Sequence, residues 1–175
     1  MSNLLNDYHH RRSYLDNINY DEGRTRLIGF YDWLLSEPEI TKIINKLKNS
    51  IDINKITEGC GYSHGPQAST PDEITSLAIF FLDKIKDGVQ TYNLCDQYGI
   101  HSIYDSGDLQ SDFEEMMDKY INPAFDFIEQ KIEEIQSEDD KKNIPYTLKT
   151  QYPLEITQSL KLFEKDHPNY QRNVL

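Results

Sequence analysis

The amino-acid sequence predicts an all-α fold, a compact single-domain helical bundle. Apolar residues recur at helical spacing in several separate segments, and capping signals mark where helices begin. No stretch shows the sustained two-residue alternation of a half-buried strand. With 175 residues the chain is long enough to bury a hydrophobic core without disulfides or metal. We therefore expect about five to seven helices in one domain over residues 1–175, with 1–18 and 137–150 loop-like or flexible.

Two helices and a short third one are expected in the N-terminal part of the chain. The first spans residues 20–35, where apolar side chains recur every three or four positions. Ser36 and Pro38 then predict a new start, because Ser caps a helix and Pro fits its first turn. This second helix ends at Ser50, and a short helix over residues 51–58 follows.

The clearest capping signal is Thr70-Pro71-Asp72-Glu73. Thr70 is expected to accept from the exposed backbone amides while Glu73 reaches back, which forms a capping box. The helix that follows has a wide apolar surface and ends at Gly88, which predicts a central, buried element. A shorter helix is expected over residues 90–98.

The longest element is expected over residues 108–137, along one continuous apolar stripe. Asn122-Pro123 interrupts it. Because Pro removes a hydrogen bond and clashes with the preceding turn, we expect a kink or a fresh start capped by Asn122. A charged loop over residues 137–143 and a last helix over residues 154–165 complete the prediction.

Negative charge is concentrated in one part of the chain. The formal net charge is −12 at pH 7. Residues 1–50 balance 7 acidic against 7 basic side chains, whereas residues 71–140 carry 18 acidic and 4 basic, a net −14. Such a surface repels phosphate backbones, so direct nucleic-acid binding is disfavoured. An acidic partner is disfavoured as well, and the expected partner is a protein with a basic surface.

Several features indicate a soluble cytoplasmic protein. No segment approaches the roughly 18 apolar residues that a membrane span needs, and residues 1–12 lack the apolar stretch of a secretory signal. Cys60 and Cys95 are too few for a disulfide framework, so we expect free thiols in a reducing compartment. Richness in Ile, Asn, Lys and Tyr is consistent with a low-GC bacterial or phage genome.

The most distinctive loop spans residues 59–65, with three glycines and a Cys and a His four positions apart. Here or at residues 100–107 a small hairpin is possible. Cys60, His64, Cys95 and His101 offer two thiolates and two imidazoles to a tetrahedral zinc ion. Their spacing lacks the paired short knuckles of structural zinc sites, so buried cysteines and loop histidines are the more common outcome. We therefore expect no metal and no cofactor.

An enzyme is the less favoured interpretation. In a thiol mechanism Cys60 would attack, His64 or His101 would act as base and Asp105 would orient the base, but no known nucleophile motif surrounds Cys60. The segment Glu164-Lys165-Asp166-His167 has the Glu-x-x-His spacing of di-metal bundles, and no second copy of that spacing accompanies it.

The acidic face of the long helix is the strongest functional candidate. Its carboxylates lie away from the apolar stripe: Glu114, Glu115, Asp118, Glu129, Glu133 and Glu134. On a helix, carboxylates three or four positions apart are about 5–6 Å apart, comparable with the phosphates of a nucleic-acid strand. The face is therefore either a nucleic-acid mimic of the kind used in phage–host conflict or an ordinary solvated surface, which is the commoner case.

The N-terminal residues 8–14 are basic and aromatic. They bind an anion or dock onto the acidic long helix, and docking is the simpler interpretation because that surface is already present in the chain. Nearby aromatic residues form either the core, which is more common, or a protein-binding patch: Tyr14, Tyr20, Phe30, Tyr31 and Trp33.

Taken together, these patterns favour a non-catalytic protein that acts by protein–protein interaction or regulation. The alternatives are an acidic nucleic-acid mimic that inhibits a DNA- or RNA-binding enzyme and a small Cys/His enzyme or zinc-stabilised module. A partner held in an apolar groove would depend on aromatic side chains such as Trp33 or Phe127.

Overall fold

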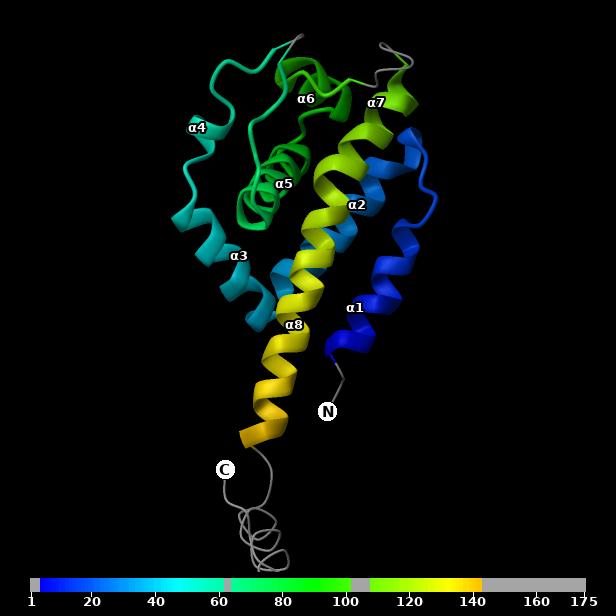
Figure 1. The fold of residues 1–175 in the computed structure, drawn as a ribbon. Helices are drawn as coiled ribbons and strands as arrows, with labels where there is room; N and C mark the ends of the chain where they lie inside the picture. The colour runs from blue at the N-terminus through cyan, green and yellow to red at the C-terminus, as the bar shows by residue number, and fades with distance from the viewer. Residues whose placement is uncertain (1–3, 62–63, 102–107, 143–175) are drawn as a thin grey trace, which may run out of the picture. The chain divides into compact units, whose positions relative to one another are not determined.

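A computed structural model of the chain describes residues 4–61, 64–101 and 108–142 (Figure 1). The all-α prediction is confirmed, because the described residues form helices and contain no strand, only an isolated bridge between Gly61 and His64. Internal contacts divide the chain into two units, residues 1–134 and 135–175, so the single domain over residues 1–175 stays a prediction. Within the described residues no helix has the length and apolar character to cross a membrane.

The helices follow one another in the order α1 to α8, with a short 3₁₀ turn, η1, after α1 and a π-helical segment, η2, between α7 and α8. Their bounds are α1 Leu4–Arg12, η1 Ser13–Leu15, α2 Tyr20–Ser36, α3 Pro38–Ser50, α4 Ile53–Ile56, α5 Pro71–Lys86, α6 Thr91–Tyr98, α7 Leu109–Met116, η2 Met117–Ile121 and α8 Asn122–Lys142.

Two segments expected to be loop-like are helical. Residues 4–15 form α1 and η1. The local sequence is too polar to predict this helix, and the burial of Tyr8 against the rest of the fold stabilises it. The helix α8 continues through the expected loop to Lys142, since neither Gly nor Pro occurs between Phe125 and that residue. The last expected helix lies outside the described residues.

The capping box at the start of α5 is confirmed. The Thr70 hydroxyl accepts from the Glu73 amide at 3.2 Å, and the Glu73 carboxylate accepts from the Thr70 amide at 3.0 Å. Hydrogen bonds from the Ser69 and Thr70 amides lower the Glu73 pKa to about 2. The predicted cap at Ser36 is wrong. Ser36 is the last residue of α2, where its hydroxyl donates to the Trp33 carbonyl, and Glu37 is the N-cap of α3.

Pro123 is accommodated without ending the long helix. The chain remains helical from α7 through η2 into α8, and Asn122 has helical angles of φ −62° and ψ −49°. The fresh start capped by Asn122 is therefore wrong. Instead the Asn122 amide donates to the Met117 carbonyl five residues back, a π turn directly before the residue that lacks an amide.

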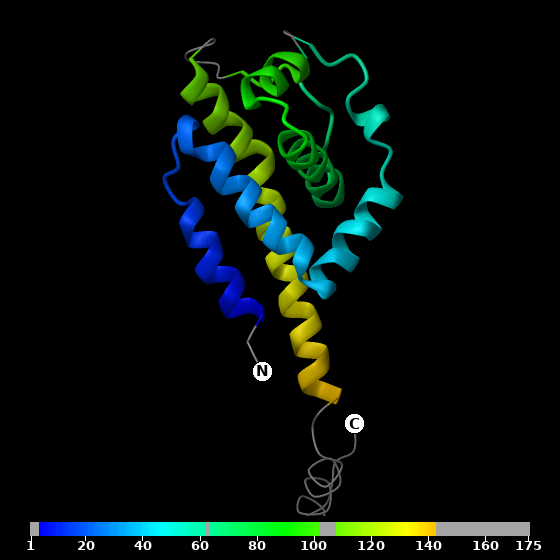
Figure 2. The same ribbon diagram turned by 180° about the vertical axis from the view of Figure 1, so that it is seen from behind.

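The N-terminal segment docks onto the long helix, as predicted (Figures 1 and 2). The buried Tyr8 hydroxyl donates to the Phe125 carbonyl at 2.7 Å, and His9 Nε2 lies 2.7 Å from a Glu129 oxygen. Arg12 donates to the Asn122 side chain at 2.9 Å and lies over the Phe125 ring.

The core prediction for the aromatic residues holds for most of them. Phe30, Tyr31 and Trp33 are buried in the main apolar cluster, and Tyr20 packs against it while half-buried. Tyr14 is the exception with 58% of its surface exposed.

Candidate functional site

The backbone of the glycine-rich loop packs against the end of α6. Gly99 ends α6 in the left-handed conformation with φ +62°, and a side chain there would overlap the carbonyl oxygens of Gly61 and His64. The loop backbone therefore lies directly on Gly99. Gly65 approaches the same helix end, next to the Tyr98 carbonyl. This close backbone approach requires glycine at position 99. In the loop itself Gly59 has a φ of +75°, whereas a side chain at Gly61 would meet no atom within 4 Å.

The two thiols are poorly suited to nucleophilic attack. Burial, with a smaller contribution from the neighbouring carboxylates of Asp112 and Asp96, raises the Cys95 pKa to about 12. The Cys95 Sγ lies 3.6 Å from the Asp112 carbonyl oxygen, and the side chain is almost completely buried. Burial also raises the pKa of Cys60. Since the thiolate is the reactive form, both thiols are held in the unreactive state at neutral pH.

The zinc arrangement is not assembled. Within the described part of the chain, which includes Cys60, His64, Cys95 and His101, no group of three or more His, Cys, Asp or Glu residues is placed to hold a metal ion. The His101 Nδ1 instead lies 3.1 Å from an Asp112 oxygen, and both side chains are largely buried. Sequence reasoning missed Asp112, because nothing in its local pattern indicates that α7 carries it to the end of α6. Asp105, Glu164 and His167 lie outside the described residues.

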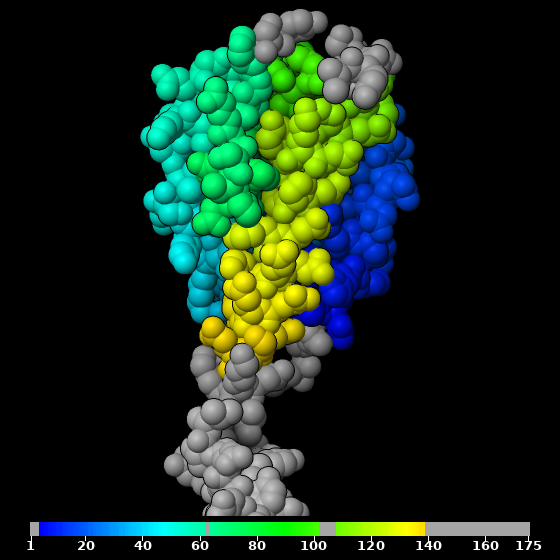
Figure 3. All heavy atoms as spheres, in the orientation of Figure 1, coloured from blue at the N-terminus to red at the C-terminus, as the bar shows by residue number. Residues whose placement is uncertain are grey.

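The carboxylates of the predicted acidic face have different partners and surroundings. Glu129 pairs with His9, Glu115 pairs with Lys119, and Glu134 lies 2.8 Å from Lys131. Glu133 is exposed. Glu114 and Asp118 differ from these, because both line a cavity. Figure 3 shows the outer surface of α7 and of the first turns of α8 open between α1 and the start of α5.

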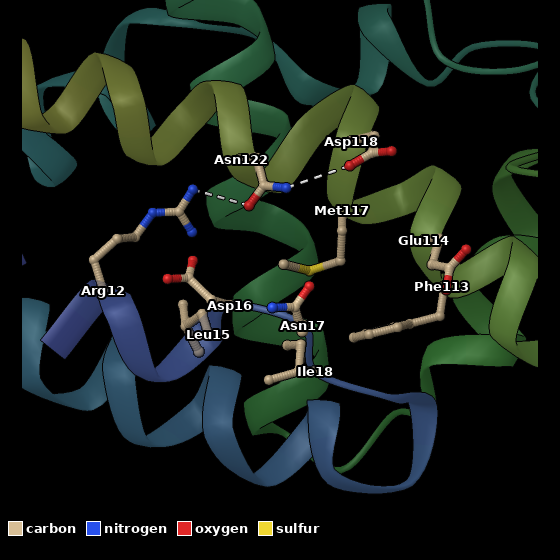
Figure 4. Close-up of a pocket in the computed structure, with 10 residues that line it drawn as sticks. All are labelled: Arg12, Leu15, Asp16, Asn17, Ile18, Phe113, Glu114, Met117, Asp118 and Asn122. Atoms are coloured by element: carbon tan, nitrogen blue, oxygen red, sulfur yellow. Dashed lines mark hydrogen bonds between the residues drawn. The ribbon is translucent and has the colours of Figure 1, made fainter.

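This cavity, the acidic cleft, has a volume of about 520 Å³ and lies between the α1–α2 connection and the start of the long helix (Figure 4). Its lining residues are Arg12, Leu15, Asp16, Asn17, Ile18, Phe113, Glu114, Met117, Asp118 and Asn122. Buried apolar side chains line its interior, and the carboxylates of Asp16, Glu114 and Asp118 add negative charge to its wall. The volume falls within the range of about 300–1,000 Å³ that is typical of ligand sites.

Two backbone irregularities meet at the acidic cleft. Asn17, with φ +55°, is the one residue other than Gly with positive φ in the described ranges. The π-helical segment η2 supplies Met117 and Asp118 from the opposite wall. Both irregularities have structural causes, because Asn adopts the left-handed conformation readily and the π turn accommodates Pro123. Their effect is to bring Asn17, Met117 and Asp118 to the same cavity.

The one cation in the described lining of the acidic cleft is already engaged. Arg12 donates to Asn122, which in turn donates to Asp118 at 3.4 Å (dashed lines in Figure 4), and the guanidinium also lies 3.7 Å from Asp126. Its side chain is only 19% exposed. Because Arg12 is committed to the long helix, it does not balance all three carboxylates of the cleft. The arrangement is suited to a cationic group carried on an apolar stem.

Sequence reasoning found Glu114 and Asp118 but missed Asp16 and Asn17. These two residues come from a connection that was expected to be loop-like, and no helical pattern relates them to residues almost one hundred positions later. The predicted docking of residues 8–14 onto the long helix could have indicated Asp16 and Asn17, because it places the turn that follows next to α7.

The described residues form an all-α fold with a cavity lined by apolar and acidic side chains. No family model, curated protein or solved structure matches the chain.

Proposed function

We propose that this chain is a non-catalytic interaction protein that binds a partner protein with a basic surface, and that the acidic cleft receives a lysine or arginine side chain of the partner. The observation that carries this proposal is the gathering of three exposed carboxylates beside buried apolar side chains in one open cavity of about 520 Å³. A basic side chain buries its methylene stem while its charged group reaches polar atoms, so it matches both parts of the cavity.

The concentration of charge in the chain supports the same kind of partner. The net −14 of residues 71–140 attracts a basic surface from a distance, and the cleft supplies the short-range contacts. The raised pKa of Cys60 and Cys95 favours this interpretation over a thiol enzyme. The mimic alternative has less support, because contacts within the chain already engage two of its carboxylates: Glu115 pairs with Lys119, and Glu129 lies 2.7 Å from His9 Nε2.

The proposal is tested by capture of the partner from source-cell lysate on the tagged chain, washed across a salt series with and without competing DNA. The cleft variant is Glu114→Gln combined with Asp118→Asn. Its matched control, Glu133→Gln with Asp87→Asn, removes the same charge from exposed positions that do not line the cleft. We expect the wild type and the control to retain a basic protein that high salt releases, and the cleft variant to lose it.

Other outcomes discriminate between the alternatives. A partner that the cleft variant retains as well as the wild type does would contradict the role of the cleft. Release of the partner by DNA, with equal weakening in both variants, would favour mimicry by the whole acidic face. Retention at high salt would indicate an apolar contact. The candidate for such a contact is Phe127, which is half-buried in a groove beside Pro71 and Ile74.

A further inference from the structure

The helix α2 contains two glycines whose surroundings are opposite. A methyl group built at Gly23 would overlap the ring of Phe113, so the close approach of α7 requires a glycine there. A methyl group built at Gly29 would meet no atom within 4 Å. Gly29 is exposed, and it lies inside a helix with no positive φ that would call for glycine.

Gly29 therefore lowers the stability of α2 without a packing reason. A glycine in a helix interior costs about 0.5–1 kcal/mol relative to alanine, because it loses more conformational freedom on folding. The absence of a side chain at Gly29 leaves space, because Gly29 lines a groove of about 240 Å³ between α1 and α2. Figure 2 shows these two helices side by side.

The groove carries positive charge and aromatic surface, in contrast to the acidic cleft. Its lining residues are Arg11, Tyr14, Leu15, Arg26, Gly29 and Phe30. Leu15 and Phe30 are each 5% exposed and form an apolar base, while the exposed Tyr14 ring adds aromatic surface to the lining.

The two guanidinium groups of the groove differ in their partners. Arg26 donates to the Tyr14 carbonyl at 3.1 Å and pairs with Glu22 at 2.5 Å, yet its side chain is 43% exposed. Arg11 lies over the Trp33 ring, 5.1 Å from the ring centroid, and forms no ion pair within the described part of the chain. Guanidinium groups bind carboxylates through paired hydrogen bonds. Because Glu22 already pairs with Arg26, Arg11 is the guanidinium group of the groove that is suited to an anionic group.

We propose that this groove binds a short peptide segment of a partner in which a carboxylate lies beside an apolar side chain. The apolar side chain would lie over Gly29 against Leu15 and Phe30, and the carboxylate would meet Arg11. The volume of about 240 Å³ is smaller than that of most small-molecule sites, which favours a side chain as the occupant. The net charge of −12 repels a polyanion such as nucleic acid, so the negative charge of the ligand has to be local.

The experiment uses the full chain as bait for a displayed library of random peptides about 12 residues long, a length that spans a recognition groove. The most enriched sequence is then synthesised with a fluorophore, together with an analogue in which Gln replaces each acidic residue. Fluorescence anisotropy compares the wild type with Gly29→Leu, which fills the groove, and with Gly29→Ala, which leaves most of it open. The cleft variant Glu114→Gln with Asp118→Asn is measured in parallel.

We expect enriched peptides that carry Asp or Glu beside an aromatic or aliphatic residue. Gly29→Leu, Arg11→Gln and the Gln analogue should each weaken binding by about tenfold or more, and Gly29→Ala by less than about threefold. Binding should be unchanged in the cleft variant, so failure here and failure of the proposed function are distinguishable. Circular dichroism confirms folding of Gly29→Leu, which places a good helix former inside a helix.

Several results would overturn the inference. These are a library that yields no enriched sequence, enriched peptides without carboxylates, and equal affinity for the wild type and Gly29→Leu. Displacement of the peptide by a short oligonucleotide at a lower concentration than by the unlabelled peptide would assign the groove to nucleic acid instead and would also contradict it.

Discussion

The acidic cleft and the groove beside Gly29 share one lining residue but place neighbouring residues in different surroundings. Leu15 lines both cavities. Arg12 faces the cleft, largely buried and bonded to Asn122, whereas Arg11 is exposed and lines the groove. Two adjacent arginines therefore have unlike roles: Arg12 holds α1 on the long helix, and Arg11 is free to meet a ligand. The difference comes from the 100° turn between successive helical residues, and residue type alone does not reveal it.

The largest expected difference between the two regions is in how much an apolar side chain of each contributes to the free energy of unfolding. Phe113→Ala in the cleft should lower the free energy of unfolding by about 3–5 kcal/mol, because the ring is 1% exposed and its loss leaves a cavity. Tyr14→Ala in the groove should change it by less than about 0.5 kcal/mol, since the side chain is 58% exposed. Urea unfolding followed by Trp33 fluorescence measures both, and equal losses would contradict the contrast.

The arginine pair should show the next largest difference. Arg12→Ala removes a charge-assisted hydrogen bond and the contact with the Phe125 ring, so we expect a loss of about 1–3 kcal/mol in unfolding free energy. Arg11→Ala loses only an exposed contact with Trp33, for which about 0.5–1 kcal/mol is the upper range. Thermal unfolding of the two variants compares them directly, and a larger loss for Arg11→Ala would reverse the assignment.

The two glycines of α2 should give effects of opposite sign. Gly23→Ala forces a methyl group into the Phe113 ring and should destabilise the protein by about 1–3 kcal/mol. Gly29→Ala should stabilise it by about 0.5–1 kcal/mol, because the new methyl group meets no neighbour and the unfolded chain loses freedom. Denaturation midpoints of the two variants provide the measurement. Destabilisation by Gly29→Ala would mean that this glycine has a packing role after all.

The smallest effect is expected at the thiols, which line neither cavity. At neutral pH, iodoacetamide should leave Cys95 of the folded protein unmodified, because its pKa of about 12 and its burial leave almost no accessible thiolate. Cys60 should react more slowly than a free cysteine, since burial raises its pKa as well. Mass spectrometry of the alkylated protein, with a urea-unfolded sample as the reference, reads both sites. Fast modification of Cys60 would revive the thiol-enzyme alternative.

Much of the fold was predictable because its signals are local. The capping box at Thr70, the buried helix α5 and the long apolar stripe of α7 and α8 each depend on residues within a few turns of one another. The errors also have local causes. Ser36 matches the pattern of a cap but lies at the end of α2, and Pro123 matches a helix break but is absorbed by the π turn before it.

The candidate site was only half predictable. Charge patterning identified Glu114 and Asp118, since both belong to one acidic helix face. The same pattern gave equal weight to Glu129 and Glu115, which pair within the fold. The partner of Glu115 is Lys119, four residues further along the same helix, so that pair was within reach of sequence reasoning. The contact of His9 with Glu129 joins residues far apart in the chain, and only the fold brings them together.

The sequence by itself determined the helical class and the concentration of negative charge, because these follow from periodicity and composition. It favoured docking of the N-terminal segment over anion binding, and the contacts of Tyr8 and Arg12 with the long helix decided between the two. Only the tertiary structure decided which side of each helix meets another element. That packing brings Asp16 and Asn17 opposite α7, requires Gly23 and leaves Gly29 uncovered. A cavity is the space that several packed elements leave between them, and a local pattern in the chain does not specify such a space.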